Sequence, residues 1–535
     1  MTDTSTPPAP PPMLVMPFPK AAIYVFASLL IGIAQGLGMS FFSSNLSQVQ
    51  GEFSATQQEA LWLVAAYLAP AALTVALVKI RTQFGLRLFA QVALACFVAA
   101  ALLNLAALDL ESGVVVRFLS GMAAAPISTL AFLYMLEPFS PPYKLSVGLS
   151  LTLMGTSLGA PLSRVLAPHL LDLGGWHQVT VLELALALIA AALVHLLPLT
   201  PVPREKVIQR WDFVSFPLIF VGMGSLAVAL TVGRSYWWFD RWWLGVMMAG
   251  AVAALILAGL IELNRKTPLI DIRWIVSPAI LQFAGALLIF RIVLAEQTSG
   301  APGLFQTLGL QNAQMQGMFW MILGMTVLGG IVSAAVLKPG REHAIHAVAL
   351  MLIIAGALMD SNSTSLTRPP QMMVSQAMIA FASALFLPAA MAAGLIVAFR
   401  KGPLYILSFI IVFLLTQRIG GALGSALFQT VLQFRQNAHT TRLHEGLGQS
   451  DPLVIQRLQT YAGAYTGTTA DVAARQAQAV TTLGQTVQRE ATVLAYNDIF
   501  FMIACVATGA LAVLLVHWAL ILRSARIAAG TPANG

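Results

Sequence analysis

The sequence has few cysteines and few charged residues. Two of its 535 residues are cysteine, and lysine, arginine, aspartate and glutamate together make up only 9%. Cys96 and Cys505 lie in separate apolar runs, so the sequence predicts neither a disulfide framework nor a cysteine-bound metal. Soluble globular proteins carry about 25% charged residues. This composition therefore excludes an ordinary soluble protein.

Motifs of catalytic chemistry are also missing. The sequence has no GxxxxGK[ST] phosphate-binding loop, no cluster of metal ligands, and no nucleophile, base and acid at a recognisable spacing. We therefore expect no enzyme activity, no cofactor and no metal. The net charge of +8 comes from basic residues dispersed over short segments. That pattern is typical of a membrane orientation signal, and we expect no nucleic-acid partner.

Long apolar runs are what the sequence has in abundance. Hydrophobic residues make up 58% of it, and about 20 consecutive apolar residues suffice to cross a lipid bilayer as a helix. We therefore predict an all-α polytopic membrane protein with fourteen transmembrane helices. The predicted spans are 21–45, 58–80, 86–108, 112–136, 143–171, 177–199, 212–233, 243–263, 276–297, 315–337, 343–359, 372–398, 403–434 and 497–522.

The distribution of lysine and arginine predicts how the spans are oriented. With the N-terminus inside, the inner segments carry most of these residues, and the short outer loops hold only Arg234, Arg241 and Arg368. Basic residues accumulate on the cytoplasmic side of membrane proteins. We therefore expect both termini in the cytoplasm, which requires an even number of spans.

Several arginines lie inside the predicted spans. Arg117 and Arg164 stand in the fourth and fifth runs, among small residues that let helices pack closely. A charge at the centre of a membrane helix costs at least about 2.5 kcal/mol, so it normally faces a partner or a wet cavity. Arg291 and Arg418 are candidate cavity residues of the same kind. Since carboxylates are scarce, we expect a positive cavity and an anionic or weakly acidic, amphipathic substrate.

Two carboxylates inside the spans are candidates for proton coupling. Glu183 lies deep in the sixth run, and Glu296 lies at the outer end of the ninth. Depth favours Glu183, paired with Arg117 or Arg164, whereas position favours Glu296, paired with Arg291. A static ion pair that only holds helices together is the alternative.

Residues in the later spans indicate a role in substrate binding or proton coupling less clearly. Met318 and Phe319 belong to a methionine and aromatic stripe on the tenth run and are candidate substrate-cavity residues, although helix packing explains such a stripe equally well. Asp360 and Asp498 lie at span ends, where we expect them to be solvated.

Segment 435–496 is the one long stretch between spans. Asp451-Pro452 is a typical helix start, and Thr469 or Asp471 can begin a second helix. Apolar residues recur at steps of three and four in the second helix and predict one apolar face. That face either packs on the protein itself or docks an external partner. Its residues are Val480, Leu483, Val487, Ala491 and Leu494.

The order of four motifs resembles that of a known family. These motifs are Val114 to Gly121 followed by Pro126, Gly155-Thr-Ser-Leu-Gly159-Ala-Pro161, Arg418-Ile-Gly420-Gly421-Ala-Leu-Gly424, and Tyr496-Asn-Asp-Ile-Phe500. With them, nearly the whole chain resembles the fourteen-span drug:proton antiporters of the major facilitator superfamily. The EmrB type of Gram-negative inner membranes is the most similar branch.

The resemblance implies a fold, a function and partners. The implied fold has two six-helix halves and two inserted helices, with Gly155, Gly159, Pro161, Gly420, Gly421 and Gly424 as gating-motif residues. The implied function is proton-coupled efflux of hydrophobic or amphipathic compounds across the inner membrane. The implied partners, besides the lipid bilayer and a small-molecule substrate, are a periplasmic adaptor and an outer-membrane channel. A dedicated exporter of one siderophore, fatty acid or aromatic acid, and a receptor or scaffold without transport, are alternative functions.

The resemblance also predicts how the chain is divided. We expect a Pro-rich cytoplasmic tail (1–20), an N-terminal half (21–199), the inserted helices with their flanking loops (200–275), a C-terminal half (276–522) that includes the outer segment 435–496, and a cytoplasmic tail (523–535).

Three positions depart from the family pattern. The loop from Val78 to Arg87 keeps only a glycine and some basic charge of the motif that usually connects the two halves. Gly38 stands where the family usually has an aspartate. Arg164 follows the fifth-span motif where small residues are usual.

Overall fold

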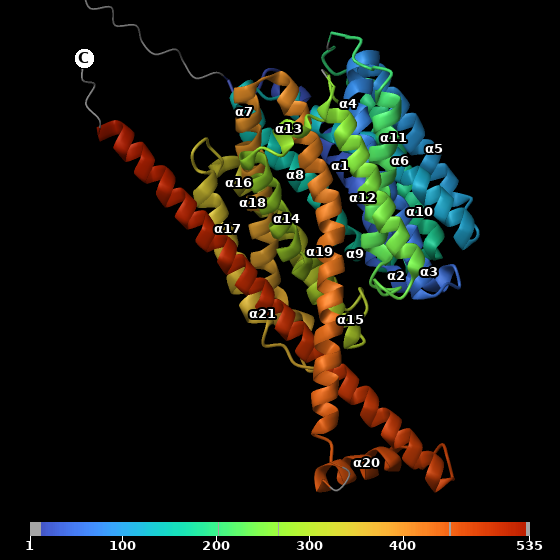
Figure 1. Ribbon diagram of the computed structural model, residues 1–535. Coiled ribbons are helices and arrows are strands. Elements are labelled where there is room, and N and C mark those ends of the chain that lie inside the picture. The colour runs from blue at the N-terminus through green and yellow to red at the C-terminus, as the bar shows by residue number, and fades with distance from the viewer. Residues whose placement is uncertain (1–11, 202, 266, 449–450, 531–535) are drawn as a thin grey trace, which may run out of the picture.

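The computed structural model describes residues 12–201, 203–265, 267–448 and 451–530, and most of them are helical (Figure 1). The helices are α1 (Phe18–Ser44), α2 (Leu46–Glu52), α3 (Gln57–Leu68), α4 (Leu73–Phe84), α5 (Leu86–Leu105), α6 (Leu110–Leu136), α7 (Pro141–Tyr143), α8 (Leu149–Ser157), α9 (Gly159–Gly174), α10 (Trp176–Leu196), α11 (Asp212–Val232), α12 (Trp242–Leu263), α13 (Ile272–Ile275), α14 (Pro278–Val293), α15 (Ala301–Thr307), α16 (Gln316–Val336), α17 (Glu342–Asp360), α18 (Met373–Lys401), α19 (Pro403–Glu445), α20 (Pro452–Ala464) and α21 (Val472–Gly530).

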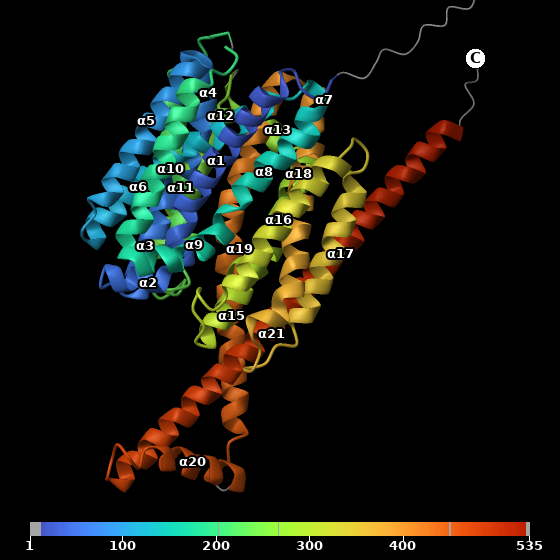
Figure 2. The ribbon, with the colours of Figure 1, turned by 180° about the vertical axis from the view of Figure 1, so that it is seen from behind.

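The described residues form 14 helical spans that are long and apolar enough to cross a membrane, as predicted. Residues 1–11 and 531–535, which belong to the two predicted tails, lie outside the described residues. The helix α1 begins, and α21 ends, at the same end of the bundle, which we call the terminal end (Figures 1 and 2). The opposite end, where α20 lies, is the hairpin end.

The spans form two halves and an inserted pair. In the N-terminal half, α1 packs on α6, α9 and α10, and α5 packs on α6 and α10. In the C-terminal half, α18 packs on α16 and α17, and α19 and α21 pack on each other. The inserted helices α11 and α12 pair with each other, and α11 also packs on α3. This arrangement is the predicted major facilitator architecture.

Three spans are interrupted by non-α turns. Ala69–Ala72, which contains Pro70, is a 3-10 turn between α3 and α4. A π turn over Lys144–Gly148 precedes α8, and a second π turn over Glu296–Gly300 separates α14 from α15. Single π turns inside helices occur frequently at functional sites. The second turn begins at Glu296, a predicted site residue, and is therefore a candidate functional element.

Glycines of the predicted gating motifs let helices touch backbone to backbone. A Cβ atom on Gly159 of α9 would lie 2.5 Å from the carbonyl carbon of Gly36 in α1. A Cβ atom on Gly424 of α19 would lie 2.8 Å from the carbonyl oxygen of Arg291 in α14. Small residues permit such close contacts in membranes. Both glycines therefore have a packing role that a larger side chain would disrupt.

Segment 435–496 extends beyond the bundle as a helical hairpin (Figures 1 and 2). The helix α20 begins at Pro452, where the Asp451 side chain accepts a hydrogen bond from the Leu453 backbone N–H, and the next helix begins at Val472. Both predicted helix starts are confirmed. However, α21 runs unbroken from Val472 through the last span, so Tyr496 does not begin a separate helix.

The apolar face predicted for this hairpin is only partly buried. Val487 and Ala491 are buried, as expected, whereas Val480 is 59% exposed and Leu494 is 39% exposed. Ala479 takes the buried position next to Val480. The packed face is thus rotated relative to the predicted one, and apolar side chains remain exposed on the protruding segment.

Candidate substrate and proton sites

Arg117 is anchored in the N-terminal half. Its helix, α6, starts where Asp109 accepts a hydrogen bond from the Ser112 backbone N–H at 2.7 Å, which also lowers the pKa of the Asp109 carboxyl. Arg117 is 1% exposed and donates from Nη2 to the Gly38 carbonyl oxygen at 2.6 Å. Its guanidinium also stacks over the rings of Phe42 and Tyr67, at 3.9 and 4.4 Å from their centroids.

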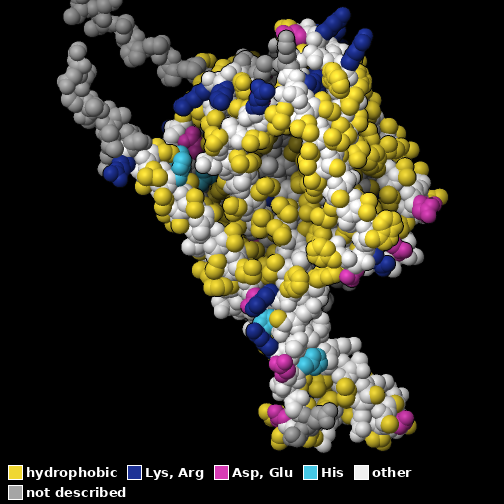
Figure 3. All heavy atoms as spheres, viewed as in Figure 1, with side chains coloured by type: hydrophobic (Ala, Val, Ile, Leu, Met, Phe, Trp, Pro, Cys, Tyr) yellow, Lys and Arg dark blue, Asp and Glu magenta, His cyan; other side chains and the backbone are white. Residues whose placement is uncertain are grey.

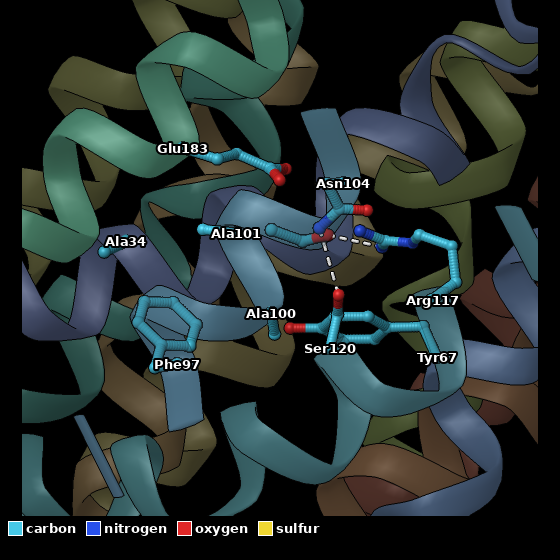
Figure 4. A pocket seen from close by; sticks show the side chains of 10 residues that line it. Ala34, Tyr67, Phe97, Ala100, Ala101, Asn104, Arg117, Ser120 and Glu183 are labelled. Carbon is cyan, nitrogen blue, oxygen red and sulfur yellow. Dashed lines mark hydrogen bonds between the residues drawn. The ribbon is translucent and has the colours of Figure 1, made fainter. Parts of the chain in front are cut away.

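Arg117 and Glu183 line the same pocket, whose cavity volume is about 20 Å³ (Figure 4). Asn104 donates to Ser120 at 3.0 Å on its wall. Glu183 Oε1 and Arg117 Nε and Nη1 are buried without a hydrogen-bond partner, and the described residues show no direct ion pair between the two side chains. A cavity of this size has room for about one water molecule and is far smaller than the roughly 300–1,000 Å³ usual for ligand pockets. The pocket therefore fits a small polar group.

Arg418 lies where the two halves meet, and Arg291 lies on the neighbouring helix α14 of the C-terminal half. Arg418 of α19 donates to Ser128 Oγ of α6 at 2.9 Å, a contact from the C-terminal to the N-terminal half. Arg291 of α14 donates from Nη2 and Nε to the Gln417 carbonyl oxygen at 2.8 and 3.1 Å. Among the described residues neither arginine pairs with a carboxylate. Their charges are available to a negatively charged group.

Arg164 takes part in a second contact between the halves, at the hairpin end. Its Nη1 donates to Asn312 Oδ1 at 3.1 Å, and its Nη2 lies 3.5 Å from the Thr298 carbonyl oxygen. Asn312 in turn donates to Asn45 Oδ1 at 2.8 Å and to the Ser44 carbonyl oxygen at 2.9 Å. We call Arg164, Asn312 and Asn45 the outer latch. Arg164 therefore does not pair with Glu183.

A buried carboxylate pair lies in the C-terminal half. Glu296 and Asp360 are 0% and 2% exposed, and the Gln376 amide donates from Nε2 to both, at 2.7 and 2.8 Å. Ser375 Oγ donates a further hydrogen bond to Asp360. The expectation that Asp360 is solvated is wrong, because α18 and the π turn pack over the end of α17. Asp498 is 30% exposed and pairs with Arg435 and His439 at the base of the hairpin.

The terminal end carries a network of ion pairs. Asp212 of α11 accepts from Lys79 at 2.9 Å and from Arg265 at 2.5 Å, and Arg265 also pairs with Glu262 at 2.7 Å. Lys79 belongs to the loop region whose family motif is degraded. The ionic contact that this region makes is therefore with the inserted helix α11.

The remaining candidates have mainly packing roles in this structure. Met318 is fully buried in the core of the C-terminal half, and Phe319 lies under the Arg164 guanidinium, 5.1 Å from its ring centroid. Gly155 and Pro161 lie on α8 and α9, where a Cβ atom on Gly155 would lie 2.9 Å from Leu29. Gly420 and Gly421 face the Arg291 side chain.

Asp360, Gln376 and Asn312 are site residues that sequence reasoning missed. The signal for Gln376 was available, since a lone amide inside an apolar run must find a buried partner in the bilayer. The partners themselves depend on tertiary packing.

Comparison with known proteins shows which transporters the chain resembles. The model of the family described as "Sugar (and other) transporter" matches residues 20–202. The colistin resistance protein EmrB of Acinetobacter baumannii is 22% identical over 510 residues, covering 91% of this chain and 94% of that protein. The fatty acid resistance protein FarB of Neisseria gonorrhoeae is 26% identical over 264 residues, covering 47% of this chain but only 50% of that protein.

A solved structure shows the same fold. The human organic anion transporter MFSD10 superposes with a TM-score of 0.53 at 13% identity, covering 92% of this chain and 100% of that one. The fourteen-span architecture, the family match and these relatives together indicate a multi-pass membrane transporter rather than an enzyme. The chain has the fold of the major facilitator superfamily and resembles its EmrB-type proteins.

Proposed function

We propose that the protein exports amphipathic organic anions across the inner membrane in exchange for protons. The anionic substrate is proposed because Arg418, where the halves meet, and Arg291, on the neighbouring helix, have no carboxylate partner among the described residues. A buried charge needs compensation, and a substrate anion supplies it. The two relatives are named as resistance proteins, which supports efflux.

The proposed orientation places the terminal end in the cytoplasm. Lysine and arginine gather at this end, beyond a broad hydrophobic band around the bundle (Figure 3). The outer latch and the hairpin then face the periplasm. Because the latch is closed, the structure corresponds in this proposal to the state in which access from the periplasm is blocked.

Proton coupling requires an acidic group whose protonation differs between the two access states. Glu183 beside Arg117, and Glu296 in the C-terminal half, are the two proposed groups. They differ in surroundings, since the first faces an arginine and the second another acid. Uptake into vesicles with an imposed proton gradient measures the exchange itself, whichever group carries the proton.

The test is uptake into everted membrane vesicles with an imposed proton gradient, using one lipophilic acid and one lipophilic cation. We expect the gradient to drive uptake of the acid only. Arg418→Gln should reduce that uptake, whereas Arg341→Gln, at an exposed position of the terminal end, should not. Gradient-driven uptake of the cation alone would refute an anionic substrate. No gradient-driven flux of either compound would support a receptor or scaffold instead.

We further propose that the hairpin docks a periplasmic adaptor, which connects to an outer-membrane channel. Exposed apolar side chains on a segment that protrudes from the bundle support this, among them Leu453, which is 74% exposed, and Val480. Large exposed apolar residues that cluster often mark interaction sites. A photo-crosslinking residue at position 453 should capture an adaptor protein in intact cells. Capture of lipid alone would contradict this role.

A further inference from the structure

The surroundings of the carboxylate pair indicate that it does not carry two full charges. Glu296 and Asp360 are almost completely buried, and one amide nitrogen donates to both. Glu296 Oε2 and Gln376 Oε1 are buried without any partner. Two adjacent buried carboxylates with so few donors cannot both be ionised at tolerable cost. The pair is therefore held together by a shared proton in the latched structure.

The charged and titratable groups on neighbouring elements are directed elsewhere. No lysine, arginine or histidine bonds to either carboxylate in the described part of the chain. Such groups on the surrounding helices have other partners: Arg164 of α9 reaches Thr298, Arg291 of α14 binds Gln417, Arg418 of α19 binds Ser128, His346 of α17 packs on Phe386, and Tyr496 of α21 covers Gly303.

The position of the Gln376 amide argues for a proton over a metal ion. Its nitrogen stands between the two carboxylates, where a bound cation would have to be. An amide N–H₂ group is a donor and cannot ligate a cation. The site therefore fits a proton. One of the two carboxyl groups is protonated, and the Gln376 amide nitrogen donates to one oxygen of each carboxyl group.

The π turn connects this pair to several other elements. Glu296 begins the turn, and the next side chain, Gln297, donates to the Gln376 carbonyl oxygen at 3.2 Å. The Thr298 carbonyl oxygen faces Arg164 of the outer latch, and Ser299 Oγ bonds to Ser425 of α19 at 3.1 Å. A change at Glu296 thus acts on a turn that also contacts the latch.

We propose that Glu296, Asp360 and Gln376 form a proton-binding site that controls the outer latch through the π turn Glu296–Gly300. The inference rests on the proposed proton exchange and names the residues that perform it. While the latch is open, the pair is hydrated and can lose its proton. Closing the latch removes the water and requires the proton. Because a ligand favours the state that binds it better, proton binding favours the closed latch.

The test measures the latch directly and needs no substrate. The full chain is placed in lipid nanodiscs, with Cys96 and Cys505 replaced by serine, and spin labels are attached at Ser47→Cys and Ala313→Cys. Both positions are exposed and flank Asn45 and Asn312. Distances between the labels are recorded from about pH 5 to about pH 9, a range that covers the shifted carboxyl groups known in proteins.

We expect the fraction of long distances to rise with pH in the wild type. Coupling free energies of this kind usually correspond to a change of roughly 5- to 150-fold in the open-to-closed ratio. The isosteric variants Glu296→Gln and Asp360→Asn, and their combination, should keep the short distance at every pH. Asp240→Asn, an exposed acid at the same end, is the matched control and should behave like the wild type.

Three results would overturn the proposal: a wild-type distance that does not depend on pH, a pH response that survives in the double variant, or a response to sodium ions at constant pH instead. Vesicle uptake separates this inference from the proposed function. If uptake is gradient-driven while the double variant still responds to pH, the proton site is wrong and the exchange stands. If the wild type shows no gradient-driven uptake but its latch responds through the pair, the exchange is wrong and the site stands.

Discussion

The N-terminal and C-terminal halves each bury a carboxylate, and the two differ in what lies beside it. Glu183 shares its pocket with Arg117, whose positive charge compensates a carboxylate. Glu296 lies against Asp360, and among the described residues only the neutral Gln376 and Ser375 donate to this pair. A compensated charge can stay ionised in both access states. An uncompensated pair must change its protonation when its hydration changes, which is the property that coupling requires.

The two sites also differ in what they touch. The Arg117 pocket is enclosed by helices of the N-terminal half, namely α1, α3, α5, α6 and α10. The carboxylate pair adjoins a π turn that contacts the outer latch and α19. The first site can stabilise its half without sensing the other half. The second is placed where a local change reaches the contact between the halves.

The largest expected effect comes from removing the cation of the N-terminal pocket. Arg117→Gln leaves Glu183 without compensation and removes the bond to the Gly38 carbonyl oxygen. The lost hydrogen bond from a charged group is worth about 1.5–3 kcal/mol, and the loss of the nearby positive charge adds to that cost. We expect a clear fall in the thermal denaturation midpoint of the purified protein in detergent. Adding Glu183→Gln should restore part of the loss, and a double variant no more stable than Arg117→Gln would contradict the compensation.

The next largest effect concerns the latch. Arg164→Leu removes the bonds to Asn312 and Thr298, and a hydrogen bond from a charged group is worth about 1.5–3 kcal/mol. We expect the labels at positions 47 and 313 to move to longer distances at every pH. Arg341→Gln, at an exposed position of the terminal end, serves as the control. Unchanged distances in Arg164→Leu would show that these contacts do not hold the latch closed.

A smaller effect is expected when the compensated acid itself is neutralised. Glu183→Gln should lower gradient-driven uptake of a lipophilic acid by less than about tenfold, equivalent to 1.4 kcal/mol. Uptake should remain driven by the gradient, because the coupling pair is intact. Suppose instead that gradient-driven uptake is abolished while the protein still inserts and exchanges substrate without a gradient. The N-terminal pocket is then the coupling site, and the carboxylate pair is not.

The fold could be predicted from the sequence because bilayer physics leaves few choices. A span of about 20 apolar residues must be a helix with its backbone bonds satisfied internally. The fourteen spans are therefore found where predicted. The capping pattern at Asp451 likewise determined the start of α20.

The carboxylate pair could not be predicted in the same way. Asp360 lies at the end of a span, and its burial depends on how α18 and the π turn pack over it. Sequence spacing relates residues within one helix, whereas Glu296, Asp360 and Gln376 come from three different spans. The role of Arg164 was hidden for the same reason, because Asn312 and Asn45 lie far from it in the chain.

The smallest effects provide the most specific comparison of the two sites. Asn104→Ala removes the neutral bond to Ser120 in the N-terminal pocket, and Ser299→Ala removes the neutral bond to Ser425 beside the carboxylate pair. Each bond is worth about 0.5–1.5 kcal/mol, so the two variants should lose similar thermal stability. Only Ser299→Ala should change the pH dependence of the label distance, because of these two bonds only the one to Ser425 involves the π turn. Equal pH responses in the two variants would show that the turn does not transmit the proton's effect.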